Sequence, residues 1–230
     1  MMSYGRPLIV AIDGPSGAGK GTVARTVAAR LSYRHVDTGA MYRAVAWRAL
    51  ASEVDLGDEA AVAALAERAS IDVNARVVID GHDVTHAIRT PAIDRAAAIV
   101  AQHAGVRAVL VERQRQYGEG GGVIVEGRDI GSVVFPGADV KLYLDADPEE
   151  RARRRAEDHL HTSIRESSRS GVARALAERD QADRMRRASP LTIPPDAVYI
   201  DTTALAIHEV VELVLRLVES RSGAAGPGPD

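Results

Sequence analysis

A glycine-rich segment near the start of the chain has the residue types and spacing of a phosphate-binding loop. It follows a short apolar run at 8–12 and precedes apolar residues spaced four apart at Val23, Val27 and Leu31, so we expect a strand, a turn and a helix in that order. Backbone N–H groups of such a loop can surround a triphosphate, and the start of the helix adds positive potential. Lys20 can reach the terminal phosphate, and the Thr22 hydroxyl can contact the phosphate chain. The predicted loop consists of Gly14, Pro15, Ser16, Gly17, Ala18, Gly19, Lys20, Gly21 and Thr22.

One position of this loop departs from the general pattern. Gly21 stands where P-loop proteins usually carry the serine or threonine that binds Mg²⁺. We therefore expect Mg²⁺ to accompany ATP through water-mediated contacts, with no metal ligand from the loop. A zinc site is not expected, because the chain has no cysteine and because His82 and His86 flank a predicted hairpin rather than share a helix face.

Arginine supplies nearly all of the positive charge. All but two of the 29 basic residues are arginine, whose planar fork suits phosphate and carboxylate, and Lys20 is one of the two lysines. Residues 151–187 hold eleven arginines against six acids, which fits either a solvated helical surface or a lid that closes over ATP. Arg179 and Asp183 are four apart, with Arg186 three further on, which fits either a helix salt-bridge ladder or one face of a binding site.

Short apolar runs recur along the chain with helical stretches between them. Besides the first run they lie at 34–36, 123–125, 140–144 and 198–200, which predicts a parallel sheet covered on both faces. Residues 71–86 break the alternation and predict short antiparallel strands, with Asp80-Gly81 as a hairpin turn. We expect a core formed by 1–38, 101–150 and 174–222, a substrate-side insert over 39–100, a lid over 151–173 and a disordered tail over 223–230.

Composition limits the class of protein. The chain has 230 residues, 46% of them hydrophobic and 27% charged, which is typical of a soluble globular protein. A net charge of −3 and an aromatic content of 3% argue against nucleic acid or an anionic membrane as partner. The absence of cysteine, and a first apolar run too short for a signal or membrane segment, predict a cytoplasmic protein. We expect a monomer, because no exposed apolar heptad is evident.

Several motifs beyond the loop resemble one family. The stretches AIDGPSGAGKGT, DTGAMYR at 37–43, IRT at 88–90, EGRDIGSVVFP at 126–136 and ERDQADRMR at 178–186 are similar to bacterial cytidylate kinases, and the resemblance runs from about 8 to 215. It implies an α/β, three-layer fold of the P-loop nucleoside monophosphate kinase type, with a five-stranded parallel sheet, flanking helices, an inserted subdomain with small antiparallel strands that binds the monophosphate, and an arginine-rich lid. The implied activity is phosphorylation of CMP and dCMP by ATP, in pyrimidine nucleotide metabolism.

The resemblance also implies roles for individual residues. Lys20, Arg128 and Arg186 would be catalytic, and Arg155 would join the loop in binding ATP. Arg128 has support of its own, because it follows the end of a predicted parallel strand, where ligands bind in open α/β sheets. The residues implied for the acceptor are Thr38, Arg43, Arg128 and Arg186 at its phosphate, Arg179 and Asp183 at its ribose, and Arg107 and Asp129 at its base.

The sequence leaves two roles open for Asp129, recognition of the base and contact with the metal. A carboxylate beside an arginine complements the amine donor and ring acceptors of cytosine, whereas uracil would present an acceptor to that carboxylate. Asp129 could instead lie on the metal side, as an aspartate after a strand often does in P-loop proteins. The family also uses a serine hydroxyl at the base, and this chain has Ala98 at that position.

The sequence leaves three alternatives to phosphorylation of CMP and dCMP. The chain could be a kinase for uridylate, deoxynucleotides or a metabolite hydroxyl, although a hydroxyl acceptor usually requires a general base that the sequence does not clearly offer. It could be a nucleotide-dependent switch, but no guanine-reading motif of the Asn-Lys-x-Asp kind is present. A nucleic-acid-dependent ATPase is disfavoured by the net charge.

Overall fold

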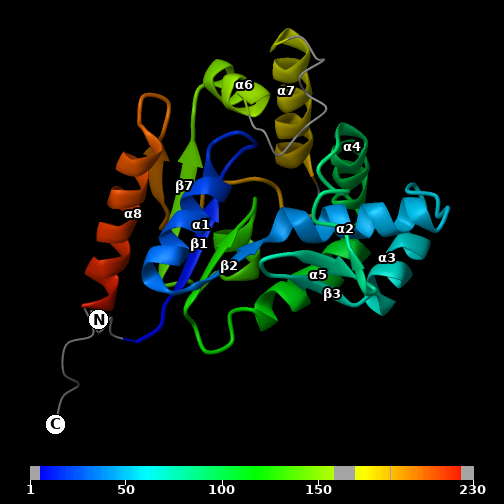
Figure 1. The fold of residues 1–230 in the computed structure, drawn as a ribbon, viewed down its shortest axis with the longest axis horizontal. Coiled ribbons are helices and arrows are strands. Elements are labelled where there is room, and N and C mark those ends of the chain that lie inside the picture. The colour runs from blue at the N-terminus through cyan, green and yellow to red at the C-terminus, as the bar shows by residue number, and fades with distance from the viewer. Residues whose placement is uncertain (1–5, 158–168, 187, 224–230) are drawn as a thin grey trace.

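A five-stranded parallel sheet forms the centre of the protein. The structure is a computed structural model that describes residues 6–157, 169–186 and 188–223. The strand order in the sheet is β2-β6-β1-β7-β8, so the strand that leads into the glycine-rich loop is central (Figure 1). All five predicted strands are confirmed. They are β1 (Ile9–Asp13), β2 (Arg34–Asp37), β6 (Val123–Glu126), β7 (Val140–Asp145) and β8 (Val198–Asp201).

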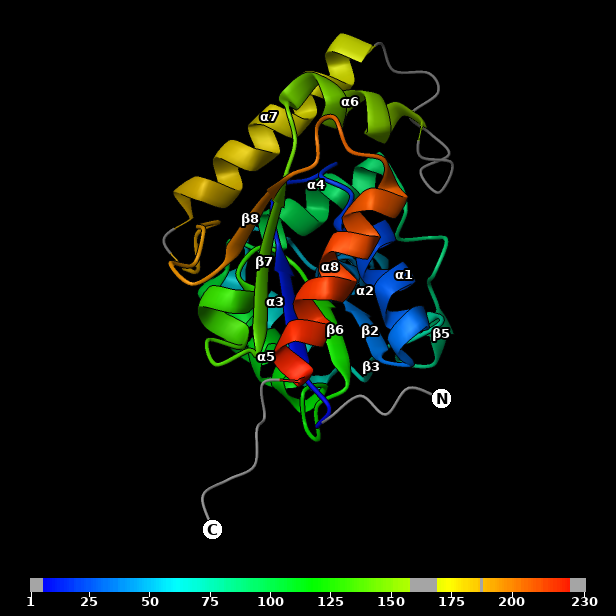
Figure 2. The ribbon, with the colours of Figure 1, turned by 90° about the vertical axis from the view of Figure 1, so that its left-hand side faces the viewer.

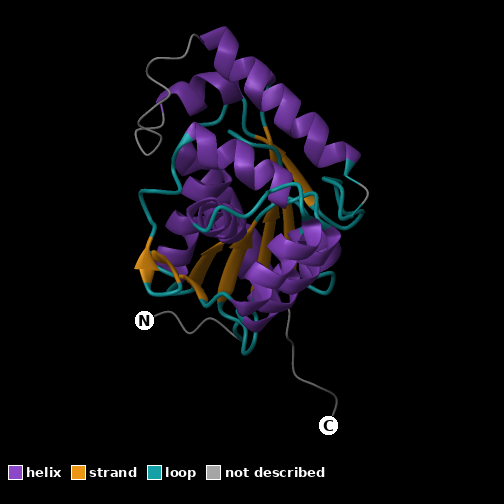
Figure 3. Ribbon diagram, turned by 90° about the vertical axis from the view of Figure 1, so that its right-hand side faces the viewer, coloured by secondary structure: helices purple, strands orange, loops and turns teal. Residues whose placement is uncertain are grey.

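Helices cover both faces of this sheet, because its inner strands are apolar on both sides. Val10 and Ile12 point to one face, where they pack with α1 (Lys20–Leu31) and α8 (Ile207–Ser222). Figure 2 shows these two helices side by side against the sheet. Ala11 points to the other face, which is covered by α5 (Ala104–Gln116) and a π-helical turn, η1 (Ile130–Val134). Figure 3 shows strands of the sheet side by side, with helices in front of them.

A second apolar cluster lies beside the sheet and is formed largely by the segment between β2 and α5. The predicted hairpin is confirmed: Asp80 and Gly81 join two antiparallel strands with φ angles of 49° and 78°, the left-handed values of a two-residue turn. Val106 and Leu110 of α5 belong to this second cluster, so α5 contacts both it and the sheet. The elements of the segment are α2 (Thr38–Ala51), α3 (Glu59–Arg68), β3 (Ile71–Val73), β4 (Val77–Ile79), β5 (His82–Asp83) and α4 (Pro91–Val100).

Two helices cross above the carboxyl end of the sheet. They are α6 (Pro148–Glu157) and α7 (Arg169–Met185), seen at the top of Figure 1. Ala152 of α6 packs against Val172 and Leu176 of α7 in a small apolar cluster. The predicted lid includes parts of both helices, and its residues 158–168 lie outside the described chain. The predicted disordered tail lies outside it from residue 224 onward.

None of the helices within the described ranges is both long enough and apolar enough to cross a membrane.

Candidate active site

The glycine-rich loop connects β1 to α1, which is the predicted strand–turn–helix arrangement. Gly14 has a φ of 141°, and a Cβ atom there would lie 1.9 Å from the carbonyl oxygen of Leu144, so a side chain at this position would collide with β7. Gly19 caps α1 with a φ of 89°. Both positions therefore need glycine, and together they direct the chain into the first turn of α1.

Lys20 opens α1 and is buried, with its ammonium donating to the carbonyl oxygen of Pro15 at 2.7 Å. Burial, and next the guanidinium of Arg128, lower the pKa of Lys20 to about 7, although the carboxylates of Glu126 and Asp13 act in the opposite direction. A buried cation whose charge is disfavoured gains most from an anionic ligand, and a phosphate chain would supply one.

Two arginines of α6 hold the outer side of the loop. Arg151 is buried; it donates from Nη1 to the carbonyl oxygen of Ser16 at 3.1 Å and forms an ion pair with Asp180 of α7. A Cβ atom at Gly17 would lie 2.8 Å from the Arg151 carbonyl oxygen, which shows how closely α6 approaches. Arg151 therefore fixes the loop to α6 and α7, a role that its sequence position among several arginines did not reveal.

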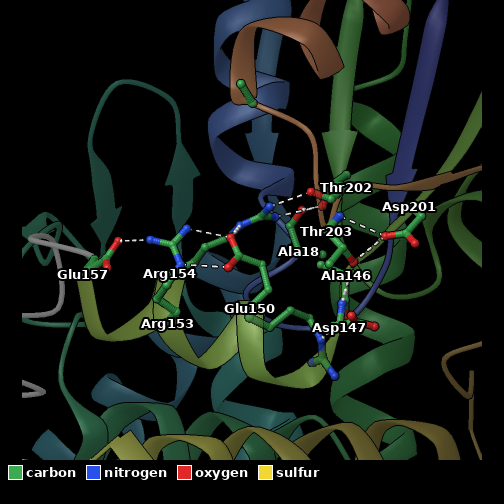
Figure 4. Close-up of polar contacts among 12 residues, drawn as sticks. Ala18, Ala146, Asp147, Glu150, Arg153, Arg154, Glu157, Asp201, Thr202 and Thr203 are labelled. Carbon is green, nitrogen blue, oxygen red and sulfur yellow. Dashed lines mark hydrogen bonds and ion pairs between the residues drawn. The ribbon is translucent and has the colours of Figure 1, made fainter.

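Arg154 makes the second connection (Figure 4). It donates to both the side-chain and carbonyl oxygens of Thr202, at 2.8 and 2.6 Å, and from Nε to Glu150 at 2.7 Å. The Thr202 hydroxyl in turn lies 3.3 Å from the carbonyl oxygen of Ala18. The segment after β8, helix α6 and the loop thus form one hydrogen-bonded unit around the predicted ATP site.

A single cavity of about 700 Å³ extends from the loop to α2, α4 and α5. Gly14, Pro15 and Ala18 are buried and do not line it. The predicted site residues that do line it come from the loop, α2, α5, the segment after β6, α6, and α7 with the residue that follows it. They are Ser16, Gly17, Gly19, Lys20, Gly21, Thr22, Thr38, Arg43, Arg107, Arg128, Asp129, Arg155, Arg179, Asp183 and Arg186.

The two residues predicted for the base both line this cavity. Arg107 of α5 forms a buried ion pair with Asp129, which follows β6. The Arg107 guanidinium also lies over the ring of Tyr42, 5.4 Å from its centroid, and burial raises the pKa of Tyr42 to about 12. Ala98 of α4 lines the cavity as well.

Three further arginines, Arg128, Arg179 and Arg186, line the same cavity. Arg128 donates from Nε to Asp183 at 2.8 Å, and Arg186, the first residue after α7, lies 3.7 Å from the same carboxylate. Burial, followed by repulsion from Arg128 and Arg43, lowers the pKa of Arg179 to about 10. Burial acts to raise the pKa of Asp183, but the surrounding arginines lower it. Positive charge exceeds negative charge here, which suits a dianionic phosphate.

Asp94 is a residue of the site that sequence reasoning missed. It lies in the first turn of α4 and accepts from Arg43 Nε at 2.9 Å, forms an ion pair with Arg155, and lies 3.5 Å from Arg179. Burial alone would raise its pKa, but these guanidinium groups hold the pKa of Asp94 well below its usual range. Arginines from α2, α6 and α7 therefore meet at a carboxylate from α4.

Two further acids were also missed, although both end a parallel strand. Asp13 ends β1, and its two carboxylate oxygens accept from the backbone N–H groups of Ile130 and Gly131, each at 2.7 Å. Burial raises the pKa of Asp13 to about 6, against the effect of these hydrogen bonds. Glu126 ends β6 beside Ile12 of β1, lines the cavity, and lies 2.9 Å from Nε2 of His35.

The residues around the loop fit Mg²⁺ that arrives with a nucleotide. Within the described chain no group of three or more acidic, histidine or cysteine side chains could hold a metal ion. Mg²⁺ in nucleotide sites is commonly held by one or two carboxylates together with phosphate oxygens and water. Glu126 offers such a carboxylate in the cavity wall, next to the loop.

The fold and the site define a small-molecule P-loop kinase. A solved gluconokinase from Sinorhizobium meliloti has the same type of fold, with a TM-score of 0.50 and 15% sequence identity over 96% of this chain and 98% of that one. The family model for cytidylate kinase matches residues 10–220, and the chain belongs to that family. Two relatives named cytidylate kinase are similar to it throughout. The relative from Geobacillus kaustophilus is 47% identical over 95% of this chain and 99% of its own, and the relative from Solibacter usitatus is 48% identical over 93% of each.

Proposed function

We propose that this chain transfers the terminal phosphoryl group of ATP to CMP and dCMP, giving ADP and the cytidine diphosphates. The observation that carries the proposal is the continuous cavity, which is lined both by the glycine-rich loop and by the Arg107–Asp129 pair. A nucleoside triphosphate and a nucleoside monophosphate can therefore meet inside it with their phosphates among the arginines. Membership of the cytidylate kinase family supports the same activity.

Each substrate has its own set of residues in this proposal. The loop from Gly14 to Thr22, with Arg155, binds ATP. Arg179 and Asp183 bind the ribose of the acceptor, and Arg107 with Asp129 reads its base. The phosphate of the acceptor is bound by Thr38, Arg43, Arg128 and Arg186.

The reaction requires positioning and charge neutralisation rather than a base. A phosphate oxygen of the acceptor attacks the γ-phosphorus of ATP, the bond from that phosphorus to the bridging oxygen breaks, and ADP leaves with the electron pair. The attacking oxygen is already ionised near neutral pH, so no side chain has to remove a proton. Lys20, Arg128 and Arg186 neutralise the charge that develops on the transferred group. Mg²⁺ bound to ATP supplies further neutralisation.

The proposal includes the compartment and the oligomeric state of the enzyme. We place it in the cytoplasm, where ATP and nucleoside monophosphates are made and used, and we expect it to act as a monomer.

Coupled measurement of ATP turnover tests the proposal, with CMP, dCMP, UMP, AMP and dTMP offered separately, with and without Mg²⁺. We expect strong turnover with CMP and dCMP, little with the others, and none without the metal. Equal use of UMP would contradict the assignment of Arg107 and Asp129 to base reading. Absence of turnover with every monophosphate, in a protein that binds ATP, would overturn the proposed activity.

A further inference from the structure

Asp180 of α7 is a buried acid that the proposed reaction does not use. Only 3% of its surface is exposed, and it does not line the active-site cavity. Its two carboxylate oxygens have different partners. Oδ1 accepts from the backbone N–H of Ser16 in the glycine-rich loop at 3.4 Å, and Oδ2 forms the ion pair with Nη1 of Arg151 in α6. Asp180 therefore contacts the loop directly and is also paired with the arginine that holds it.

Together, Asp180 and Arg151 bind both backbone polar groups of Ser16. The carboxylate accepts from its N–H, and Arg151 donates to its carbonyl oxygen at 3.1 Å. Arg151 is fixed in turn, because its Nε donates to the carbonyl oxygen of Ala146, just before α6, at 2.9 Å. A displacement of Ser16 relative to α7 would take hydrogen bonds from a buried ion pair, which is costly because buried charges need their partners. We therefore expect the loop and Asp180 to move together.

The helix that carries Asp180 also carries two of the residues proposed for the acceptor. Arg179 directly precedes it and Asp183 follows three residues later, and both line the active-site cavity. Apolar packing of α7 is limited. Val172 and Leu176, the buried apolar side chains in the described part of this helix, belong to a small cluster with α6 that is separate from the clusters around the sheet. The position of Arg179 and Asp183 relative to the loop thus depends in part on Asp180.

We propose that Asp180 is a positioning residue that couples the two substrate sites, so that ATP in the loop strengthens binding of the monophosphate. The inference rests on the proposed function for the identity of the acceptor, CMP. Phosphates bound by the backbone N–H groups of the loop restrict its motion. Asp180 transmits this restriction to α7, and a ligand that binds a helix already held in place loses less conformational entropy. Such coupling is reciprocal, so CMP should strengthen ATP binding by the same factor.

Titration calorimetry with CMP measures the coupling, in the absence and in the presence of a saturating non-hydrolysable ATP analogue with Mg²⁺. We expect the analogue to tighten CMP binding about fivefold or more in the wild type. In Asp180→Asn the two CMP affinities should agree within about twofold, because the neutral amide loses the ion pair with Arg151. The affinity of the nucleotide-free variant for CMP should stay close to that of the wild type, since Asp180 does not line the cavity.

Two controls separate this role from general loosening of the structure. Glu178→Gln removes the same charge from an exposed position of the same helix and should keep the full coupling. Thr202→Val removes the hydroxyl that lies 3.3 Å from the carbonyl oxygen of Ala18, so it weakens another support of the loop without a change in α7. It should also keep the coupling.

A second variant covers the possibility that Asp180→Asn does not fold, since it leaves the buried guanidinium of Arg151 without its partner. Replacement of the whole pair, Arg151→Met with Asp180→Leu, removes both charges and fills the space with apolar groups, which proteins often tolerate. This double variant should lose the coupling to the same extent as Asp180→Asn.

Hydrogen exchange gives a readout that requires no acceptor. Binding of the ATP analogue alone should slow amide exchange in α7 of the wild type and should leave it unchanged in the Asp180 variants. Three results would each overturn the inference: no coupling in the wild type, coupling that persists in the folded Asp180 variants, or loss of coupling in the two controls as well.

The two readouts also distinguish this inference from the proposed function. A protein in which the analogue slows exchange in α7 through Asp180, but which neither binds nor phosphorylates CMP, would contradict the proposed function alone. One that phosphorylates CMP but shows no coupling between the two sites would contradict this inference alone.

Discussion

Arg43 of α2, which lines the cavity proposed for the acceptor, donates from Nε to the carboxylate of Asp94 in α4 at 2.9 Å. Arg155 and Arg179 contact the same carboxylate, so one negative charge partly balances three positive charges. The arrangement has a consequence for substrate binding. Asp94 satisfies the arginines in the free protein, and it must share them with the phosphates when substrates bind.

Replacing Asp94 with asparagine should therefore tighten phosphate binding and destabilise the free protein. Asparagine keeps an acceptor for Arg43 but removes the negative charge, so the arginines repel one another more strongly and attract a dianion more strongly. We expect the Kd for CMP to fall severalfold and the melting temperature to fall by several degrees. Calorimetric titration and thermal unfolding at two salt concentrations measure both effects, and salt should reduce them.

Asp83→Asn is the control for this prediction, because Asp83 is exposed on β5, lies 3.6 Å from Arg76, and otherwise accepts from Thr85 through Oδ1, which the asparagine oxygen can replace. It should leave both quantities unchanged. Weaker binding of CMP to Asp94→Asn would contradict the prediction, and would mean instead that the Asp94 charge is needed to position the arginines.

Asp129 offers a test of base choice. Asparagine in its place would present an amide, which can donate as well as accept a hydrogen bond. Uracil has a carbonyl acceptor where cytosine has an amine, and the amide could donate to that acceptor, whereas the carboxylate repels it. We expect Asp129→Asn to lower the ratio of kcat/KM for CMP to that for UMP by tenfold or more. An unchanged ratio would remove Asp129 from base recognition.

Ala98 should shift the same ratio in the opposite direction. It lines the cavity, at the position where the related kinases are expected to carry a serine. Ala98→Ser would add a hydroxyl that can hydrogen-bond the base, and we expect preference for CMP over UMP to rise severalfold. The comparison uses the same kinetic assay, and a fall in the ratio would contradict it.

The sequence predicted the parts of the site that depend on local pattern. The strand–turn–helix around Gly14 to Thr22, the five strands and the Asp80-Gly81 turn follow from apolar periodicity and glycine placement, and all are present. The end of a parallel strand is also a local signal. It pointed to Arg128, and applied consistently it would have pointed to Asp13 and Glu126 as well.

The rest depends on tertiary structure that no local pattern encodes. Asp94 is one acid in an amphipathic helix, and its importance appears only when α2, α6 and α7 bring arginines to it. Arg151 and Arg153 are two residues apart and look alike in sequence. Arg151 is buried against the loop, whereas Arg153 is exposed and pairs within its own helix. Burial, rather than residue type, separates a structural arginine from a surface one.

Asp13 predicts a dependence of stability on pH. Its folded pKa of about 6 lies above the unfolded value of 3.8, so the folded state binds the proton more tightly between these values. Its contribution is therefore fully present below about pH 4 and is lost as the pH rises through 6. In Asp13→Asn this pH dependence should disappear. The free energy of unfolding of the wild type, relative to that of Asp13→Asn, should therefore fall by on the order of 2 to 3 kcal/mol from pH 4 to pH 7.

Urea unfolding at a series of pH values measures this change. The variant should also be less stable in absolute terms at pH 4, because asparagine offers only one acceptor to the two backbone N–H groups at the start of η1. A stability difference that stays constant with pH would show that Asp13 titrates normally in the folded protein.

Lys20 links ATP binding to proton uptake. With a pKa of about 7 in the free protein, Lys20 is mostly neutral at pH 8. The phosphates of ATP would favour the ammonium and raise the pKa, so binding should take up close to one proton at pH 8 and much less at pH 6. Calorimetry in buffers with different ionisation enthalpies measures the number of protons directly.

Lys20→Met should abolish this uptake, lower turnover by orders of magnitude and leave the fold intact. Its neutral side chain can neither titrate nor neutralise the transferred group. Proton uptake that persists in Lys20→Met would assign the titration to another group, and a nearly active variant would contradict the electrostatic role of Lys20 itself.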